Sequence, residues 1–367
     1  MFKIPRDPAF DNTIALLRDP YRFIGKRCHH LESDWFETRL LLRPAVCMRG
    51  AEAARLFYDE GRFTRSGAAP EPVQATLFGK GGVQGLDGQA HQHRKAMFLS
   101  MLNEQRIAEL VSEVRHAWVE ALILWPLRSQ VVLYQEVQLL LTRAVCRWAK
   151  IPVPEHEMAL RAGQLVSLFD DAASFRHIRS RIQRSRAEKW LAGLIEAVRA
   201  GGSAKGDSAL AVVALHRDET GALLPVRVAA VELLNVLRRT VAVSVYVVFA
   251  AHAMHLHAQS ARSLRDGDPE YLEWFIQEVR RFYPFFPVVA ARPRTQFDWQ
   301  GAAFQTSQLV LLDLYGTNHH AAAWDEPDAF RPERFSCRTS SPSILYRRVA
   351  AMRVSIIAAP AKAWRWR

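Results

Sequence analysis

Six long segments with helical periodicity constrain the fold of this 367-residue chain more than any other feature. In each segment apolar residues recur at three- and four-residue spacing, the pattern of a helix that buries one face. These segments are residues 103–125, 129–150, 155–173, 175–200, 227–256 and 268–283. The strand-like stretches are short, namely Trp35–Leu42, Ala45–Met48, Val288–Ala291, Phe297–Trp299 and Leu309–Leu312. The sequence therefore predicts a mainly α fold with a small β portion, in one large domain, with 201–208 (GGSAKGDS) as a loop between helices.

Composition excludes several classes of protein. The chain is 49% hydrophobic and 23% charged, which is typical of a soluble globular protein and not of a disordered one. Its four cysteines are far apart and form no CxxC pair, so neither a zinc ribbon nor an extracellular disulfide framework is indicated. The first twelve residues lack the apolar run of a signal peptide, and the apolar stretch 241–251 is shorter than the roughly 20 residues of a membrane span. We expect a cytoplasmic protein without a membrane span.

The net charge of +12 raises the alternative of a nucleic-acid binder. Seven of the basic residues, and no acid, lie in residues 336–367, so most of the surplus charge belongs to the tail. No helix-turn-helix, zinc-finger or RNA-platform pattern accompanies this charge. We therefore expect no nucleic-acid partner.

Glu278 and Arg281 lie three residues apart at the end of the predicted helix 268–283. At this spacing the two side chains share one helix face and can pair, which leaves part of the guanidinium for a second partner. The alternative is an ordinary ion pair on the protein surface.

The segments after this helix favour a more specific interpretation. The helix is followed by FYPFFPVVAARPR, by short strands and by TNHHAAAWDEPDAFRPERF at 317–335. This order of an ExxR pair, strands and a PERF segment resembles the cytochrome P450 family. The resemblance implies a P450-like fold over residues 1–335, in which Glu278, Arg281 and Arg334 lock together behind a haem b.

Three upstream segments narrow the resemblance to one branch of that family. They are RFTRSGAAP at 62–70, LFGKGGVQGLDGQAHQHRKAMFLSML at 77–102 and ELLNVLRRTVAV at 232–243. They are similar to the bacterial fatty-acid peroxygenases, which hydroxylate or decarboxylate fatty acids. The resemblance implies a long-chain fatty acid as substrate, hydrogen peroxide as oxidant and no obligate redox partner.

Arg238 is the residue on which this chemistry would depend. Ordinary haem monooxygenases carry an acid-alcohol pair on the long central helix, whereas the helix 227–256 offers Asn235, Arg238, Arg239 and Thr240 among apolar residues. A charge on such a helix needs a counter-charge or water. Arg238 matches the branch's arginine that binds the substrate carboxylate, which then performs the acid/base work on peroxide. The alternatives are that Arg238 and Arg239 form a polar kink or reach solvent. The branch usually has proline where this chain has Arg239.

The resemblance also implies contacts for the haem propionates and the substrate. Propionates are anions, and the candidate donors are Arg65, His91, Lys95 and, further along, Arg292. Without the resemblance, residues 91–95 would be a solvated basic face or a metal pair, but the spacing of His91 and His93 argues against zinc. The residues that match the substrate channel are Phe78, Gln84, Phe285 and Phe286, with core packing as the alternative for each phenylalanine.

The cysteine loop that ligates iron in this family is not found after the PERF segment. Cys337 lies two residues beyond Phe335 without a glycine-rich loop, and Cys28, Cys47 and Cys146 match no ligand position. Residues 338–364, back-translated with permissive third bases and read one nucleotide out of phase, can give a Gly-Gly-Gly stretch followed by His-Arg-Cys-Ala-Gly-Glu. This predicts a frameshift near residues 334–338 and an aberrant, loosely docked tail at 336–367. The alternative to a peroxygenase is therefore an inactive helical scaffold without thiolate-bound haem that at most binds lipid.

Overall fold

The computed structural model describes residues 4–171, 177–202, 206–306 and 308–336, and these form two compact units. One unit consists of residues 4–69 and 252–336, and the other of residues 70–251. The chain thus divides more finely than the single domain expected from the sequence. The domain boundary at residue 335 and the loosely docked tail at 336–367 remain predictions, because residues 337–367 lie outside the described part.

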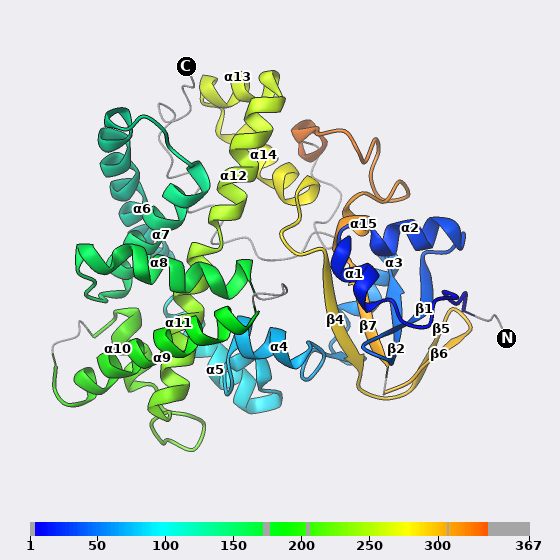
Figure 1. The fold of residues 1–367 in the computed structure, drawn as a ribbon, viewed down its shortest axis with the longest axis horizontal. Helices are drawn as coiled ribbons and strands as arrows, with labels where there is room; N and C mark the ends of the chain where they lie inside the picture. The colour runs from blue at the N-terminus through cyan, green and yellow to red at the C-terminus, as the bar shows by residue number, and fades with distance from the viewer. Residues whose placement is uncertain (1–3, 172–176, 203–205, 307, 337–367) are drawn as a thin grey trace. The chain divides into compact units, whose positions relative to one another are not determined.

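The first unit contains a five-stranded sheet in the order β1-β2-β7-β4-β3 (Figure 1). Its strands are β1 (Trp35–Leu40), β2 (Arg43–Met48), β3 (Phe63–Thr64), β4 (Val288–Pro293) and β7 (Leu309–Asp313). Neighbouring strands are antiparallel except β2 and β7, which run parallel with Val46 opposite Val310. Two further strands, β5 (Phe297–Trp299) and β6 (Ala302–Phe304), form a separate hairpin. The sheet therefore joins residues near the N-terminus to residues some 260 positions later.

Both faces of this sheet are covered. On one face α2 (Phe23–His30) packs Phe23 and Ile24 against Phe36 of β1. On the other face α3 (Ala51–Phe57) packs against β2 and β7. The remaining helices of the unit are α1 (Thr13–Arg18), α13 (Ala258–Asp266), α14 (Pro269–Phe282), α15 (Leu314–Asn318) and the 3-10 turn η4 (Pro332–Phe335). The Asp268 carboxylate accepts hydrogen bonds from the first backbone N–H groups of α14, which explains where this helix starts.

The second unit is helical. Its long helices are α5 (Gly88–Ser100), α6 (Glu104–Leu124), α7 (Leu133–Ala149), α8 (Glu155–Asp170), α9 (His177–Arg199) and α11 (Val226–Val241). Shorter elements are α4 (Glu71–Val73), the π turn η1 (Gln74–Phe78), the 3-10 turns η2 (Val83–Gly85) and η3 (Trp125–Leu127), and α10 (Ala209–Leu215). Helix α11 packs against α7, α8, α9 and α10, and most of its residues are buried. A helix that is apolar on nearly all sides belongs at the centre of a bundle, and α11 lies there.

The six helices expected from periodicity are confirmed, with one difference. The segment 227–256 is divided by a turn at 242–243 into α11 and α12 (Ser244–Leu256). Together Val226–Leu256 is long and apolar enough to cross a membrane by length and composition, although 67% of its most apolar window is buried within the protein. Core helices of globular proteins are also long, apolar and mostly buried. Helix α11 is such a helix, because it packs against α7, α8, α9 and α10. The five expected strands are also confirmed, whereas β3 and β6 were not anticipated.

Candidate functional site

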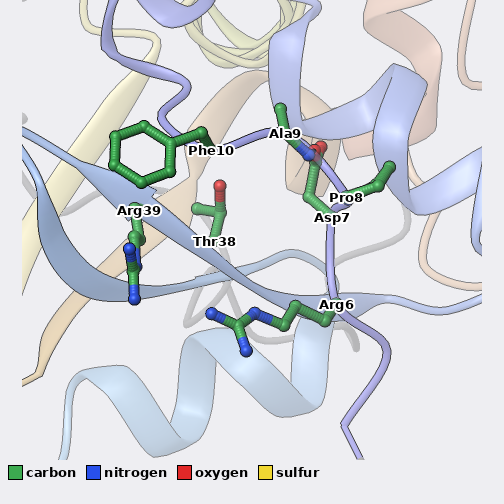
Figure 2. Close-up of a pocket in the computed structure, with 7 residues that line it drawn as sticks. All are labelled: Arg6, Asp7, Pro8, Ala9, Phe10, Thr38 and Arg39. Atoms are coloured by element: carbon green, nitrogen blue, oxygen red, sulfur yellow. Dashed lines mark hydrogen bonds between the residues drawn. The ribbon is translucent and has the colours of Figure 1, made fainter.

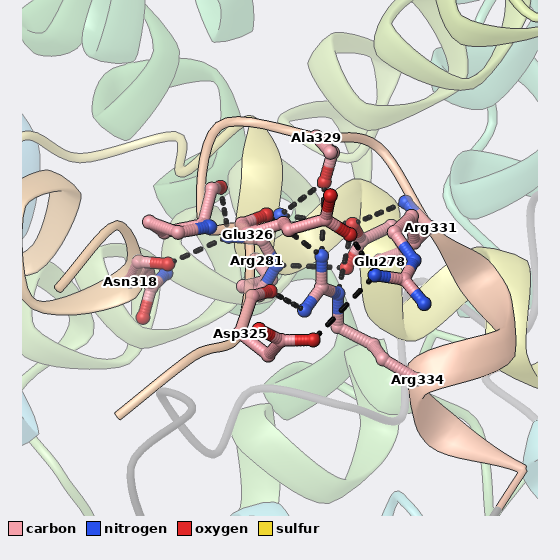
Figure 3. A network of polar contacts seen from close by, with 9 residues as sticks. Glu278, Arg281, Asn318, Asp325, Glu326, Ala329, Arg331 and Arg334 are labelled. Atoms are coloured by element: carbon pink, nitrogen blue, oxygen red, sulfur yellow. Dashed lines mark hydrogen bonds and ion pairs between the residues drawn. The ribbon is translucent and has the colours of Figure 1, made fainter. Parts of the chain in front are cut away.

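The ExxR pair forms a fully buried ion pair in the first unit (Figure 3). The Arg281 Nε lies 2.7 Å from one carboxylate oxygen of Glu278, and its Nη2 lies 2.8 Å from the other. The same guanidinium donates to the backbone carbonyls of Asn318, Pro327 and Ala329. Both side chains are 0% exposed, so the alternative of a surface ion pair is wrong.

Arg334 of the PERF turn, η4, also contacts Glu278 (Figure 3). Its Nε lies 3.3 Å from Glu278 Oε1, and its two Nη atoms donate to the carbonyls of Asp325, Glu326 and Ala329. The backbone N–H of Arg331 donates to the same Glu278 oxygen at 2.7 Å. The structure thus brings together the three side chains predicted to lock, and they fix the loop 318–335 on the end of α14. Their position behind a haem remains a prediction.

Two of the predicted propionate donors lie near each other in the first unit. Arg292 is on β4 opposite Thr64, the residue before Arg65, and its Nε donates to the carbonyl of Gly67 at 3.1 Å. The guanidinium of Arg65 is exposed and lies 5.0 Å from the ring centre of Tyr58. These two arginines therefore present positive charge at the β3–β4 edge of the sheet.

Phe285 and Phe286 follow α14 and their ring centres are 4.4 Å apart. The carbonyl of Phe285 accepts a hydrogen bond from the Tyr21 hydroxyl. Phe286 packs against the core cluster that contains Phe57 and Leu312, so a packing role is observed for this residue. A role of either phenylalanine in a substrate channel remains a prediction.

In the second unit, Arg238 lies on α11 and is only 3% exposed. The alternative that it reaches solvent is therefore wrong. One turn earlier, the Asn235 Nδ2 donates to the carbonyl of Phe78 at 2.9 Å and lies 3.5 Å from Gln84 Oε1. The structure thus gathers Phe78 and Gln84 beside the segment of α11 that carries Arg238. Asn235, which the sequence analysis noted without a role, connects them.

A second contact explains why the glycine-rich segment 79–85 lies against this helix. Arg184 of α9 donates to the carbonyls of Thr76 and Phe78 and pairs with Glu188. Gly79 has φ +79°, and a Cβ built on it would lie 2.1 Å from Arg184 Nη2 and 2.8 Å from Val231 Cγ1. Only glycine fits such a close approach with this backbone conformation.

We expect Gly79→Ala to destabilise the protein by about 3 kcal/mol, because a left-handed backbone and a steric clash add together. Gly67→Ala is the matched control, since Gly67 also has positive φ, +67°, but has no atom within 4 Å of an added Cβ. The control should lose only about 1–2 kcal/mol. Urea unfolding followed by circular dichroism measures both, and equal losses would contradict the packing argument.

The basic segment at 91–95 has a different arrangement from the one expected. His91 is partly buried and Lys95 exposed on α5, whereas Arg94 between them is buried and its Nη1 lies 2.8 Å from Glu232 Oε1 of α11. Burial raises the pKa of Glu232, and the hydrogen bond and charge of Arg94 oppose that rise. This ion pair was not predicted from the sequence, although Glu232, an acid in the middle of an apolar helix, was a visible signal for it. His91 and Lys95 as propionate donors remain predictions.

No cysteine in the described residues is suited to bind iron. Cys28, Cys47 and Cys146 are buried free thiols. Burial raises the pKa of Cys28 and of Cys146 to about 12, and raises that of Cys47 as well, so all three are protonated at neutral pH. A thiolate is the form that binds metal. Within the described part of the chain, no group of three or more His, Cys, Asp or Glu side chains could hold a metal ion either. Among the described residues there is therefore no thiolate that could serve as the axial ligand, and Cys337 lies outside them.

Comparison with known proteins identifies the family that shares this fold and sequence. The family model for Cytochrome P450 matches residues 267–346. Cytochrome P450 3A15 of Cavia porcellus is 34% identical over 67 residues, and that match spans 18% of this chain and 13% of the curated relative. The solved structure of cytochrome P450SP alpha (CYP152B1) in complex with (R)-ibuprophen is 44% identical, with a TM-score of 0.89, over 96% of this chain and 90% of that chain.

The chain belongs to the cytochrome P450 family. Two further P450 structures are similar over 99% of this chain and 90% of their own. One is cytochrome P450EX alpha (CYP152N1) with myristic acid, at 39% identity and a TM-score of 0.91. The other is a variant of cytochrome P450 OleT in complex with arachidonic acid, at 29% identity and a TM-score of 0.91. The resemblance to the fatty-acid branch of the P450 family is thereby confirmed, and the mainly α fold with it.

Proposed function

We propose that this P450 scaffold binds a long-chain fatty acid through its carboxylate and oxidises it near that carboxylate with hydrogen peroxide. The observation that carries the proposal is a buried arginine, Arg238, on the central helix of a chain similar to P450 structures that hold myristic and arachidonic acid. The family implies haem. Peroxide as the oxidant, independence from a redox partner and a cytoplasmic location are part of the proposal.

The chain's own residues suggest how the substrate is held. A carboxylate that leaves water for an apolar pocket loses its hydration, and a planar guanidinium replaces it with two parallel hydrogen bonds. Arg238 is proposed to do this and to fix the direction of the carboxylate oxygens. A carboxylate fixed in this way can accept and return a proton within the pocket, so the substrate supplies the acid/base group, since the acid of α11, Glu232, is already paired with Arg94. Asn235 and Arg184 position Phe78 beside α11 by donating to its backbone carbonyl, and Asn235 also contacts the Gln84 side chain.

The described residues do not complete an iron site, because they hold no thiolate. We therefore expect that the polypeptide with this sequence gives no thiolate-type carbon monoxide spectrum and no peroxide-driven fatty-acid oxidation. A chain whose tail is restored to the other reading frame should gain both. Carbon monoxide difference spectroscopy of the ferrous protein and product analysis with a long-chain fatty acid measure these properties.

The comparison has two informative outcomes. A thiolate spectrum from the present sequence would contradict the prediction and would indicate Cys337 as a ligand. A restored chain that binds haem but leaves fatty acids unchanged would overturn the proposed function and favour a scaffold that only binds lipid.

A further inference from the structure

A cluster of exposed apolar side chains lies at one place in the first unit. We call it the apolar tip, and it consists of Phe10, Ile14, Leu17, Leu41 and Leu42. These residues are 52–73% exposed and are five of the six exposed large hydrophobic residues described in this unit. Such a concentration within the described part of this unit indicates a contact surface.

Two hydrogen bonds join the segments that carry the tip. The backbone N–H of Leu41 donates to the Thr13 hydroxyl at 2.6 Å, and that of Leu42 donates to the Asp11 carboxylate at 2.7 Å. These bonds fasten the β1–β2 turn to the start of α1. Ile14 and Leu17 lie three residues apart on α1 and therefore share a face. The side chains project from a well-anchored backbone and not from a loose loop.

The turn that carries Leu41 and Leu42 is strained. Both residues have positive φ, 52° and 60°, in the two-residue connection between β1 and β2. Two-residue turns of this kind favour asparagine and glycine, because other side chains cost free energy in the left-handed region. The two leucines are 56% and 66% exposed, so packing inside the protein does not offset that cost. The folded chain holds the turn through the backbone hydrogen bonds to Thr13 and Asp11 but buries neither leucine side chain, which points to a role for these side chains outside the chain.

Positive charge surrounds the tip. Arg6 and Arg39 both line a pocket of about 350 Å³ beside Phe10 (Figure 2), and the Arg39 guanidinium lies 5.5 Å from the Phe10 ring centre. Arg18 and Arg43 directly follow Leu17 and Leu42 in the sequence. One acid, Asp11, lies within the tip: burial opposes the lowering of its pKa, which hydrogen bonds from Thr13 and Leu42 and the charge of Arg39 bring about. The pocket's own acid, Asp7, is already paired with Arg27 at 2.6 Å.

We propose that the apolar tip inserts into the interface of an anionic lipid bilayer, with lipid phosphates held at the Arg6–Arg39 pocket. Apolar side chains ringed by arginines match the layered chemistry of a membrane surface, in which acyl chains lie beneath negative headgroups. A second copy of the chain matches it less well, because a two-fold contact through this surface would bring arginines against arginines. The inference does not depend on haem or on fatty-acid oxidation.

The sharpest test separates insertion from folding. The double variant Leu41→Asn, Leu42→Gly installs residues that the turn favours, so it should unfold at a higher temperature than the parent protein. It should nevertheless bind phosphatidylglycerol vesicles at least tenfold more weakly in a co-sedimentation assay, because two inserted side chains are lost. The matched control is Leu124→Asn with Leu127→Gly, which removes two exposed leucines from the second unit and should leave vesicle binding unchanged.

A second experiment tests the role of the arginines around the apolar tip. Arg39→Gln should weaken binding to phosphatidylglycerol vesicles about fivefold at low salt, and the parent protein should bind pure phosphatidylcholine vesicles much less than anionic ones. The proposal is overturned if the turn variant keeps full vesicle binding or if the control loses as much. It is also overturned if light scattering shows a dimer that the turn variant dissociates while vesicles do not bind.

Discussion

Arg238→Ala is expected to weaken fatty-acid binding by about two to four powers of ten. The carboxylate would enter the pocket without its cationic partner, and losing one side of a buried charge pair costs about 3–5 kcal/mol. In a haem-loaded protein with the restored tail, turnover should fall as well, because the same carboxylate is proposed as the acid/base group. Isothermal titration with a long-chain fatty acid measures the binding change, and it requires no catalysis.

Two further variants make this result specific. Arg238→Lys should restore binding only in part, since an ammonium group lacks the planar fork that orients both carboxylate oxygens. Arg239→Ala is the matched control on the next position of α11, where the guanidinium is partly buried and lies 5.8 Å from the ring centre of Phe98. The control should change affinity much less. If Arg238→Ala kept near-normal binding and Arg239→Ala did not, the carboxylate site would have to be reassigned to Arg239.

Arg281→Leu is expected to lower the free energy of unfolding by about 3–5 kcal/mol. It removes the two-point ion pair of the buried Glu278 carboxylate, which keeps only the longer 3.3 Å contact with Arg334 as counter-charge. It also removes the Arg281 donors to the carbonyls of Asn318, Pro327 and Ala329. Urea unfolding monitored by tryptophan fluorescence measures the loss, because Trp324 lies close to this guanidinium.

Arg331→Gln is the matched control in the same network. Its side chain is 45% exposed and pairs with the exposed Glu326, so its removal should cost less than about 1 kcal/mol. The backbone N–H of Arg331 still donates to Glu278 in this variant. Similar losses in Arg281→Leu and Arg331→Gln would show that burial does not decide the strength of this network.

The sequence predicted those helices in which the apolar periodicity repeats over several turns. The long helices of the second unit other than α5 each present several turns of apolar periodicity, so their positions could be predicted directly. Short elements such as α3 and β3 contain too few residues for a period to show. The turn at 242–243 that ends α11 is equally invisible, because the apolar residues there are the same on both sides of it.

The candidate site was predictable where spacing alone determines geometry. Three-residue spacing on a helix is enough to place Glu278 beside Arg281. The arrangement at 91–95 was not predictable, because four-residue spacing of His91 and Lys95 does not reveal which face of α5 is buried. Burial selects Arg94, and its partner Glu232 lies 138 positions away in the sequence. Contacts at such separation are determined by helix packing, on which a local pattern carries no information.

The parallel pairing of β2 with β7 has a consequence for biosynthesis. Residues 45–48 leave the ribosome early, but their hydrogen-bonding partners at 309–312 follow about 260 residues later. At about 5–20 residues per second, β2 waits roughly 15–50 s for β7. During that time the helices of residues 70–251 are synthesised in full and their contacts are available to one another. β1 and β2 can pair with each other during this time, but the edge of β2 that later binds β7 is exposed to other chains. This makes the N-terminal segment the expected binding site for a chaperone on the nascent polypeptide.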